Sequence, residues 1–81
     1  MKATVKVRLK REVLDPQGDA IRRALGTMGF AGVADVRVGK LIEIELGDGM
    51  TADEAKAALE KMAEQLLANT VIEDFEVGVL E

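Results

Sequence analysis

The side chains that could do chemistry in this chain are carboxylates, lysines, arginines and four threonines. The 81 residues include no His, Cys, Ser, Tyr or Trp. Nucleophilic catalysis usually needs a Ser, Cys, Lys or carboxylate beside a positioned base, and His is the most common base. Without Cys and His, disulfides and the usual zinc sites are also excluded. The composition therefore predicts a protein that works through a partner and not an enzyme that works alone.

Two groups of residues look like binding sites but are better explained by the fold. Gly26, Gly29 and Gly32 follow a predicted helix, whereas a phosphate-binding loop follows a strand and opens a helix. Glu43 and Glu45 share one face of a predicted strand, where exposed carboxylates usually keep a sheet edge soluble. We interpret the glycines as helix-stop and turn residues and the glutamates as surface charges. No cofactor site and no metal site is predicted in this chain.

The first half of the chain predicts a strand followed by a helix. Apolar residues alternate with basic ones over residues 5–9, which is typical of a half-buried strand. Asp15 is a good N-cap and Pro16 suits the first helical position, so we predict a helix from Pro16 to about Met28. Gly29 would end this helix in the left-handed conformation. The apolar residues on one face of the helix are Ile21, Ala24, Leu25 and Met28.

Residues 35–46 predict one long strand and not a hairpin. With one exception, the apolar residues of this segment occupy even positions. A two-residue turn at Gly39 would place both glutamates of the segment on the core-facing side, because a one-residue slip moves every side chain to the other face. We therefore predict a straight strand with a bulge or bend at Gly39. At about 3.3 Å per residue, such a strand would span a small globule and protrude from it.

The second half of the chain predicts another helix and a last strand. Thr51 and Glu54 have the spacing of a capping box at the start of a helix over residues 52–68. Asn69 would take the left-handed conformation at the end of this helix. Alternating apolar residues over 75–79 predict the final strand.

The predicted fold is a single α+β domain over residues 1–81, a two-layer α/β sandwich with the order β-α-β-α-β. Each strand offers one apolar face, so both helices should cover the same face of the sheet. The arrangement is related to the ferredoxin-like split βαβ fold with its central hairpin pulled straight. Part of the long second strand, about residues 35–46, would then complete the sheet of another copy. This hypothesis is a strand-exchanged homodimer.

Charge is distributed unevenly along the chain. Residues 1–40 carry nine basic and four acidic side chains, whereas residues 41–81 carry two and eleven, and the whole chain has a net charge of −4. Such asymmetry fits either solvated faces or complementary surfaces that bind each other. We expect no nucleic-acid binding, because the chain is acidic and its only aromatic residues are Phe30 and Phe75. We also expect no membrane span and no signal peptide, and hence a cytoplasmic protein.

Three stretches are harder to explain by folding alone. They are Val13-Leu14-Asp15-Pro16-Gln17-Gly18, Asp35-Val36-Arg37-Val38-Gly39-Lys40, and residues 66–75, which join the second helix to the last strand. In this order and at this spacing they resemble the PurS family, the small subunit of phosphoribosylformylglycinamidine synthase, over essentially the whole chain. One departure is Thr70, where the family often has Pro.

The resemblance implies a function that the residues alone would not give. In this family the small subunit carries no active site and binds no cofactor or metal. A glutaminase subunit releases ammonia from glutamine, and a large synthetase subunit uses ATP and Mg to activate formylglycinamide ribonucleotide. The small subunit, as a homodimer that could pair further into a tetramer, bridges the other two subunits. Ammonia then gives the amidine, a step of de novo purine biosynthesis.

We expect residues of these motifs to make the subunit contacts. One group lies at a predicted exposed helix N-terminus, where free amides and the helix dipole can meet a partner. The other lies in a strand that should reach outside its own globule, and it includes an arginine, a residue favoured at interfaces. The expected contact residues are Asp15, Gln17, Gly18, Arg37, Gly39 and Lys40.

An alternative function is that of a ligand-sensing regulatory module of the ACT type, which also forms ferredoxin-like dimers. This alternative predicts a true hairpin within residues 35–46. It also predicts a small-molecule site at the dimer interface.

Overall fold

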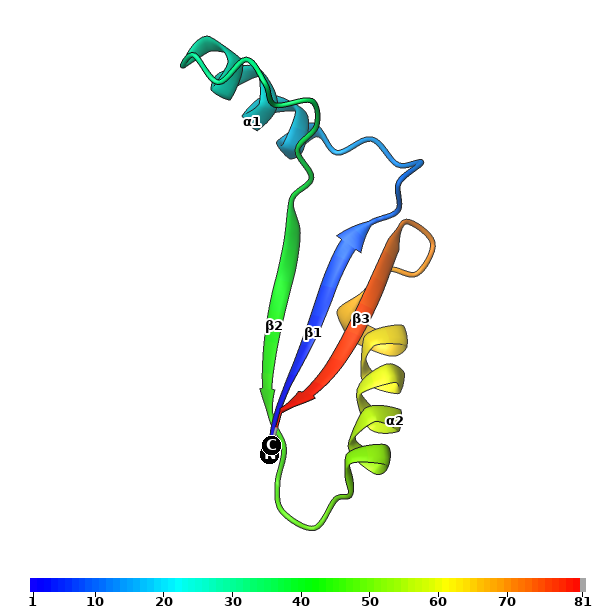
Figure 1. The fold of residues 1–81 in the computed structure, drawn as a ribbon. Helices are drawn as coiled ribbons and strands as arrows, with labels where there is room; N and C mark the ends of the chain where they lie inside the picture. Colours follow the sequence, from blue (N-terminus) through cyan, green and yellow to red (C-terminus); the bar gives the residue numbers. More distant parts are fainter. Residues whose placement is uncertain (81) are drawn as a thin grey trace.

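The computed structural model describes residues 1–80 and has the predicted order of elements. The elements are β1 (Lys2–Leu9), α1 (Pro16–Thr27), β2 (Gly39–Glu45), α2 (Ala52–Met62), a π-helical turn η1 (Ala63–Leu67) and β3 (Glu73–Leu80). The three strands form one antiparallel sheet in the order β2-β1-β3 (Figure 1). The predicted α+β class is therefore confirmed.

The core lies between one face of the sheet and α2. Alternation along β1 turns Ala3, Val5 and Val7 toward this side, and all three are buried. Val5 stands opposite Ile42 of β2 and Val77 of β3, so the apolar faces of the three strands coincide. The helix α2 contributes its small buried face, in particular Ala55 and Leu59, which are fully buried. The capping box of Thr51 and Glu54 is present at the start of this helix, as predicted.

The prediction that both helices cover the same face of the sheet is wrong. The helix α1 lies beyond the end of the sheet, joined to it by the chain segments on either side (Figure 1). Gly18 is its one buried residue, while Ile21 is 42% and Met28 70% exposed. We call residues 10–38, which contain α1, the arm. The arm stretches the chain to 51 × 26 × 14 Å, with a radius of gyration of 16.2 Å against about 12 Å for a compact globule.

The bounds of the second strand also differ from the prediction. The paired strand is Gly39–Glu45, shorter than residues 35–46. The chain nevertheless has no turn or bend from residue 33 to the start of β2, as a straight strand requires. Its pairing with β1 is regular at Gly39, so the predicted bulge or bend at this residue is wrong. Pairing stops at Gly39 because this residue stands opposite Arg8, next to the last residue of β1. Residues 35–38 have run past the end of their neighbour, which is why they belong to no sheet here.

The end of the second helix was predicted only approximately. The α-helical part ends at Met62, and η1 follows with a hydrogen bond of 2.9 Å from the Ala68 amide to the Ala63 carbonyl. This wider turn keeps both Ala63 and Ala68 buried. Ala68 is extended, and no residue other than glycine has a positive φ in the described part of the chain, so the predicted left-handed Asn69 is wrong. The predicted left-handed Gly29 is confirmed, with φ +100°.

Replacement of Leu59 should test the core between α2 and the sheet. Leu59→Ala removes a fully buried side chain, and we expect it to lower the free energy of unfolding by about 2–5 kcal/mol. The matched control is Leu66→Ala, because Leu66 is 83% exposed and its truncation should change stability by less than about 0.5 kcal/mol. Urea unfolding at one fixed protomer concentration measures both. Equal losses would contradict this description of the core.

Candidate subunit-contact site

The motif residues meet at the base of the arm, where two chain segments leave the sheet. One segment leads from β1 into α1 and the other leads from α1 into β2 (Figure 1). Asp15 and Gly18 come from the first segment and the start of α1, and Arg37 comes from the second. Each of these residues contacts the other segment. These residues therefore hold the two segments together. We call the contacts that Asp15, Gly18 and Arg37 make between the two segments the brace.

Asp15 makes the central contact of this brace. One carboxylate oxygen, Oδ1, accepts a hydrogen bond of 3.0 Å from the Gly18 amide, as an N-cap does. The other, Oδ2, accepts a bond of 2.7 Å from the amide of Val38, 23 residues further along the chain. These two bonds, from Gly18 first and Val38 second, lower the pKa of the Asp15 carboxyl below its ordinary value of 3.8. Asp15 is 4% exposed, so in a single copy its carboxylate links the two segments of the same chain.

Gly18 allows the two segments to approach closely. A Cβ atom at this position would overlap the carbonyl group of Val36. Glycine in a first helical turn costs up to about 1 kcal/mol relative to alanine. The close approach of Val36 explains why glycine stands there. The predicted exposed helix N-terminus is therefore wrong for Asp15 and Gly18, which are both buried; only Gln17 of this group is exposed.

Arg37 fixes the segment that leads into α1. Its Nη2 donates hydrogen bonds of 2.8 Å to the Lys10 carbonyl and 2.9 Å to the Val13 carbonyl. A guanidinium group has five N–H donors, so these bonds leave others for a further acceptor. The remaining motif residues lie at the start of β2. A Cβ on Gly39 would stand 2.8 Å from the Val7 carbonyl oxygen, whereas Lys40 is exposed.

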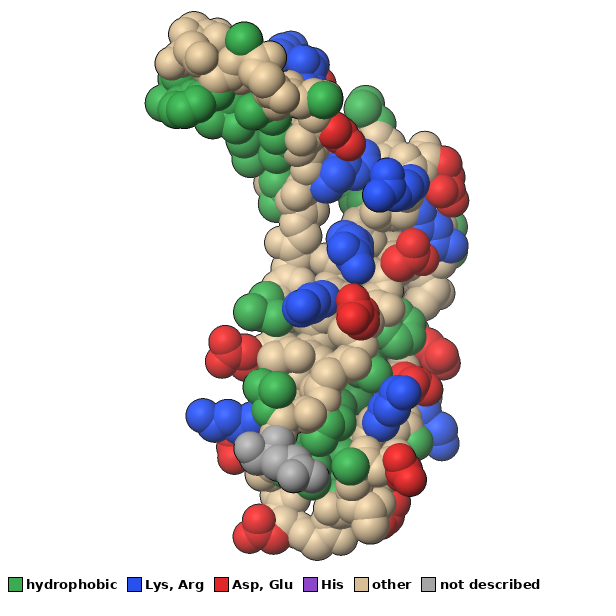
Figure 2. Space-filling view, in the orientation of Figure 1, with side chains coloured by type: hydrophobic (Ala, Val, Ile, Leu, Met, Phe, Trp, Pro, Cys, Tyr) green, Lys and Arg blue, Asp and Glu red, His purple; other side chains and the backbone are tan. Residues whose placement is uncertain are grey.

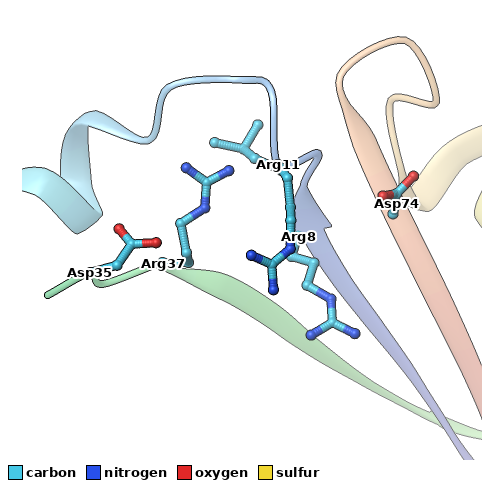
Figure 3. Close-up of a pocket in the computed structure, with 6 residues that line it drawn as sticks. Arg8, Arg11, Asp35, Arg37 and Asp74 are labelled. Atoms are coloured by element: carbon cyan, nitrogen blue, oxygen red, sulfur yellow. The ribbon is translucent and has the colours of Figure 1, made fainter.

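A hollow of about 440 Å³ lies beside this brace, lined by Arg8, Leu9, Arg11, Asp35, Arg37 and Asp74. The three guanidinium groups lie between β1 and the segment that leads into β2, with Asp35 and Asp74 on either side (Figure 3). Arg8 forms an ion pair of 3.4 Å with Glu76, and because both side chains are exposed this pair contributes little stability. Three guanidinium groups against two carboxylates give the lining of the hollow a net positive charge. No motif or spacing in the sequence points to Arg8 and Arg11 as site residues.

The side of α1 that was predicted to cover the sheet is exposed in the structure. Figure 2 shows apolar side chains gathered on the side of the arm that is turned toward the outer edge of β2. The large exposed apolar residues of the arm are Leu14, Ile21, Met28 and Phe30. Monomeric soluble proteins rarely expose such a surface without a partner. The unbroken alternation of residues 35–46 was the signal that could have shown the arm to be uncovered.

Other kinds of site find no support in residues 1–80. These residues contain no cluster of three or more acidic side chains placed to hold a metal ion. No helix among them is long and apolar enough to span a membrane.

Comparison with known proteins decides the family. The model of the PurS family, described as phosphoribosylformylglycinamidine (FGAM) synthase, matches residues 2–81. The chain belongs to the PurS family. The phosphoribosylformylglycinamidine synthase subunit PurS of Mycobacterium leprae, a family member, is 51% identical over 94% of this chain and 91% of its own. The resemblance seen in the sequence is thereby confirmed.

Solved structures of PurS proteins share the fold. Methanocaldococcus jannaschii PurS, one of the subunits of formylglycinamide ribonucleotide amidotransferase, has a TM-score of 0.89 at 41% identity, over 99% of this chain and 95% of that one. A chain of PurLQS from Thermotoga maritima has a TM-score of 0.86 at 33% identity, over 98% of this chain and 95% of that one. Both cover the arm as well as the sheet.

The brace predicts an acid-sensitive contribution to stability from Asp15. Because the pKa of Asp15 is lowered in the folded chain, its carboxylate stabilises the fold above the ordinary value of 3.8, and this stability is lost as the pH falls through the folded-state pKa. We expect Asp15→Asn to lower the melting temperature at pH 7. The difference from the unmodified chain should shrink as the pH falls below about 3.8.

Asp19→Asn is the matched control for this prediction. The pKa of Asp19 is also lowered, chiefly by the hydrogen bond from Arg22, but its ion pairs lie on the helix surface. Its replacement should therefore have a smaller effect at pH 7. Thermal melts from pH 7 to acid measure both variants. An Asp15→Asn difference that does not depend on pH would contradict the brace.

Proposed function

We propose that this chain is the non-catalytic small subunit of phosphoribosylformylglycinamidine synthase. As a homodimer it bridges the glutaminase subunit and the large, ATP-dependent synthetase subunit in the cytoplasm. Ammonia from glutamine then converts formylglycinamide ribonucleotide to the amidine in de novo purine biosynthesis. The observation that carries this proposal is the PurS match over residues 2–81. Support comes from relatives named as subunit PurS and from the similar chain in PurLQS.

The chemistry of the chain supports a bridging role. Its sequence has no His, Cys or Ser to act as base or nucleophile. ATP and Mg, in this proposal, are bound by the large synthetase subunit and not by this chain. What the chain does offer is contact surface, in the form of a braced arm with an uncovered apolar side. Such a surface suits the assembly of subunits.

The same features support a strand-exchanged homodimer. The strand β2 is an edge strand, and no other strand among residues 1–80 pairs with its outer side. Long free edges are normally covered or blunted in soluble proteins. A second copy would pair its own β2 with the free edge of β2 in the first copy. The arm of the second copy would then lie over the sheet of the first copy, beside α2 of the first copy. In this dimer the apolar residues of the arm would fill the place that α1 does not occupy in its own chain.

The ligand-sensing alternative of the ACT type is not favoured. It predicts a hairpin within residues 35–46, and the described chain has a single strand there with no turn between residue 33 and β2. The family match also points away from it.

Reconstitution of the synthase should test the proposed function. The large synthetase and the glutaminase are assayed with and without this chain, with either glutamine or free ammonia as the nitrogen donor. We expect glutamine-dependent formation of the amidine to require this chain, and ammonia-dependent formation to survive without it. The reason is that only the glutamine reaction needs the two active sites to be joined. If neither activity changes, the proposal is wrong.

A pair of arm variants can locate the effect in the same assay. Ile21→Asp places a charge on the apolar side of the arm, where Ile21 is 42% exposed. Arg23→Asp places an aspartate on the opposite side of α1, where the Arg23 side chain is 68% exposed, and it also removes a surface ion pair with Asp19 that contributes little stability. We expect Ile21→Asp to lose most of the glutamine-dependent activity and Arg23→Asp to keep it.

A further inference from the structure

We infer that the outer edge of β2 pairs with the same edge of a second copy in one register, with Leu41 opposite its own counterpart. In this register, Glu43 and Glu45 of the second copy enter the hollow lined by Arg8 and Arg37. This inference rests on the proposed function for the existence of the homodimer, and it adds the register in which the two β2 strands pair. The register follows from hydrogen-bond alternation, symmetry and charge.

The hydrogen bonds at the start of the sheet identify the free polar groups of β2. Leu46 donates to the Met1 carbonyl at 2.8 Å, and the Met1 amine donates back to the Leu46 carbonyl at 3.3 Å. Bonded and non-bonded pairs alternate along an antiparallel ladder. The even-numbered residues of β2 therefore turn their amides and carbonyls toward β1. The odd-numbered ones, which are residues 39, 41, 43 and 45, turn theirs toward the free edge.

The segment before β2 continues this alternation. The amide of Val38, an even position, points away from the free edge, because Asp15 accepts its hydrogen bond at 2.7 Å. The amide and carbonyl of Arg37 then face the same way as those of the odd-numbered residues in β2. The free edge thus runs without interruption from Arg37 to Glu45. This is roughly 26 Å of unpaired backbone in one copy.

Symmetry restricts how two such edges can pair. Residues directly opposite each other lie on the same face of a sheet, and faces alternate along a straight strand. In a two-fold dimer both opposing residues must therefore be odd-numbered or both even-numbered. It follows that one residue lies on the axis and faces its own counterpart. The candidates near the middle of the edge are Gly39, Lys40, Leu41 and Ile42.

Charge selects among these four registers. With Gly39 on the axis, Asp35 would stand opposite Glu43, and both side chains are negatively charged. With Ile42 on the axis, Arg37 would stand opposite a glycine and would face no opposite charge. An axis at Lys40 would bring two lysines face to face and would also oppose Asp35 to Glu45. Like charges directly opposite each other destabilise a strand pair.

The register with Leu41 on the axis avoids all of these conflicts. It places Glu45 of the second copy opposite Arg37, and it places no like charges opposite each other. It also buries Leu41, which is 59% exposed in a single copy, against its own counterpart. On the inner face it opposes Val38 to Ile44, and it opposes Lys40 to Ile42 instead of to a second lysine.

The same register accounts for the arginine hollow. Glu43 of the second copy would stand opposite Gly39, which in turn pairs with Arg8 on β1. Since Gly39 has no side chain, Arg8 can reach across it to this carboxylate. Glu45 of the second copy would stand beside Arg37, whose guanidinium group retains free donors. The basic first half of the chain would thus meet the acidic second half across the axis.

Disulfide formation between single cysteines can read the register directly, because the chain has no cysteine of its own. Directly opposite Cα atoms lie about 4.5–5.5 Å apart, within the range that a disulfide spans. We expect Leu41→Cys to form a disulfide-linked dimer readily under mild oxidation. Lys40→Cys and Ile42→Cys are the matched controls, and both should stay largely unlinked.

Light scattering on the same variants in their reduced, unlinked form separates the homodimer from its register. A dimer that links at position 40 or 42 in preference to 41 would overturn the register and leave the homodimer intact. A monomer at micromolar concentration would overturn both. A mixture of Val38→Cys and Ile44→Cys chains gives a second reading, because these residues oppose each other only when Leu41 is on the axis. Linkage of Val38→Cys to Ile42→Cys instead would again overturn the register.

Discussion

The side-chain alternation through Gly39 is the constraint on which the rest of this structure depends. The core-facing residues before and after Gly39 all have even numbers in the sequence. The chain therefore cannot turn back at Gly39 without moving glutamates into the core. It therefore runs straight past the end of β1 and carries α1 away from its own sheet. The free edge of β2 and the uncovered apolar side of the arm both follow from this. A single constraint on one strand thus leaves both surfaces uncovered in a single copy.

The contacts at the base of the arm hold the arm in one orientation relative to the sheet. Asp15 links the start of α1 to Val38, Arg37 links the other segment to Lys10 and Val13, and Gly18 lets the two segments touch. An arm attached by two unbraced segments would sample many orientations and would lose entropy on binding. The motif residues expected to touch partners directly would, on this account, act mainly by aiming the arm. Among the motif residues, Asp15 and Gly18 are buried, whereas Gln17, Arg37, Gly39 and Lys40 are exposed.

Much of the fold could be predicted from the sequence because it depends on local signals. The cap at Asp15, the capping box at Thr51, the left-handed Gly29 and the three alternating strands involve residues close together in the chain. The placement of α1 could not be predicted in this way, because it depends on whether the sheet is completed within one chain. The π-helical turn depends on the burial of Ala63 and Ala68 against the sheet, which periodicity does not reveal.

In the candidate site, too, local signals could be predicted from the sequence and contacts between distant segments could not. Sequence motifs identified Asp15, Gly18 and Arg37 as unusual, but their roles depend on contacts between segments more than twenty residues apart. Arg8 and Arg11 carry no motif, and only the fold brings them beside Arg37. The charge asymmetry of the two halves was visible in the sequence. The positions of the basic and acidic side chains relative to the hollow and to the free edge of β2 became known only from the structure.

Hydrogen exchange of the β2 amides, followed residue by residue by NMR, tests most directly whether a second copy covers this edge. The amides of Ile42 and Ile44 face β1 and provide an internal standard for protected groups. If two copies pair, the edge-facing amides of Gly39, Leu41 and Glu43 should exchange about as slowly as this standard. If they exchange as fast as the amides of an exposed edge at concentrations where the synthase subunits assemble, the account of the arm and the edge is contradicted.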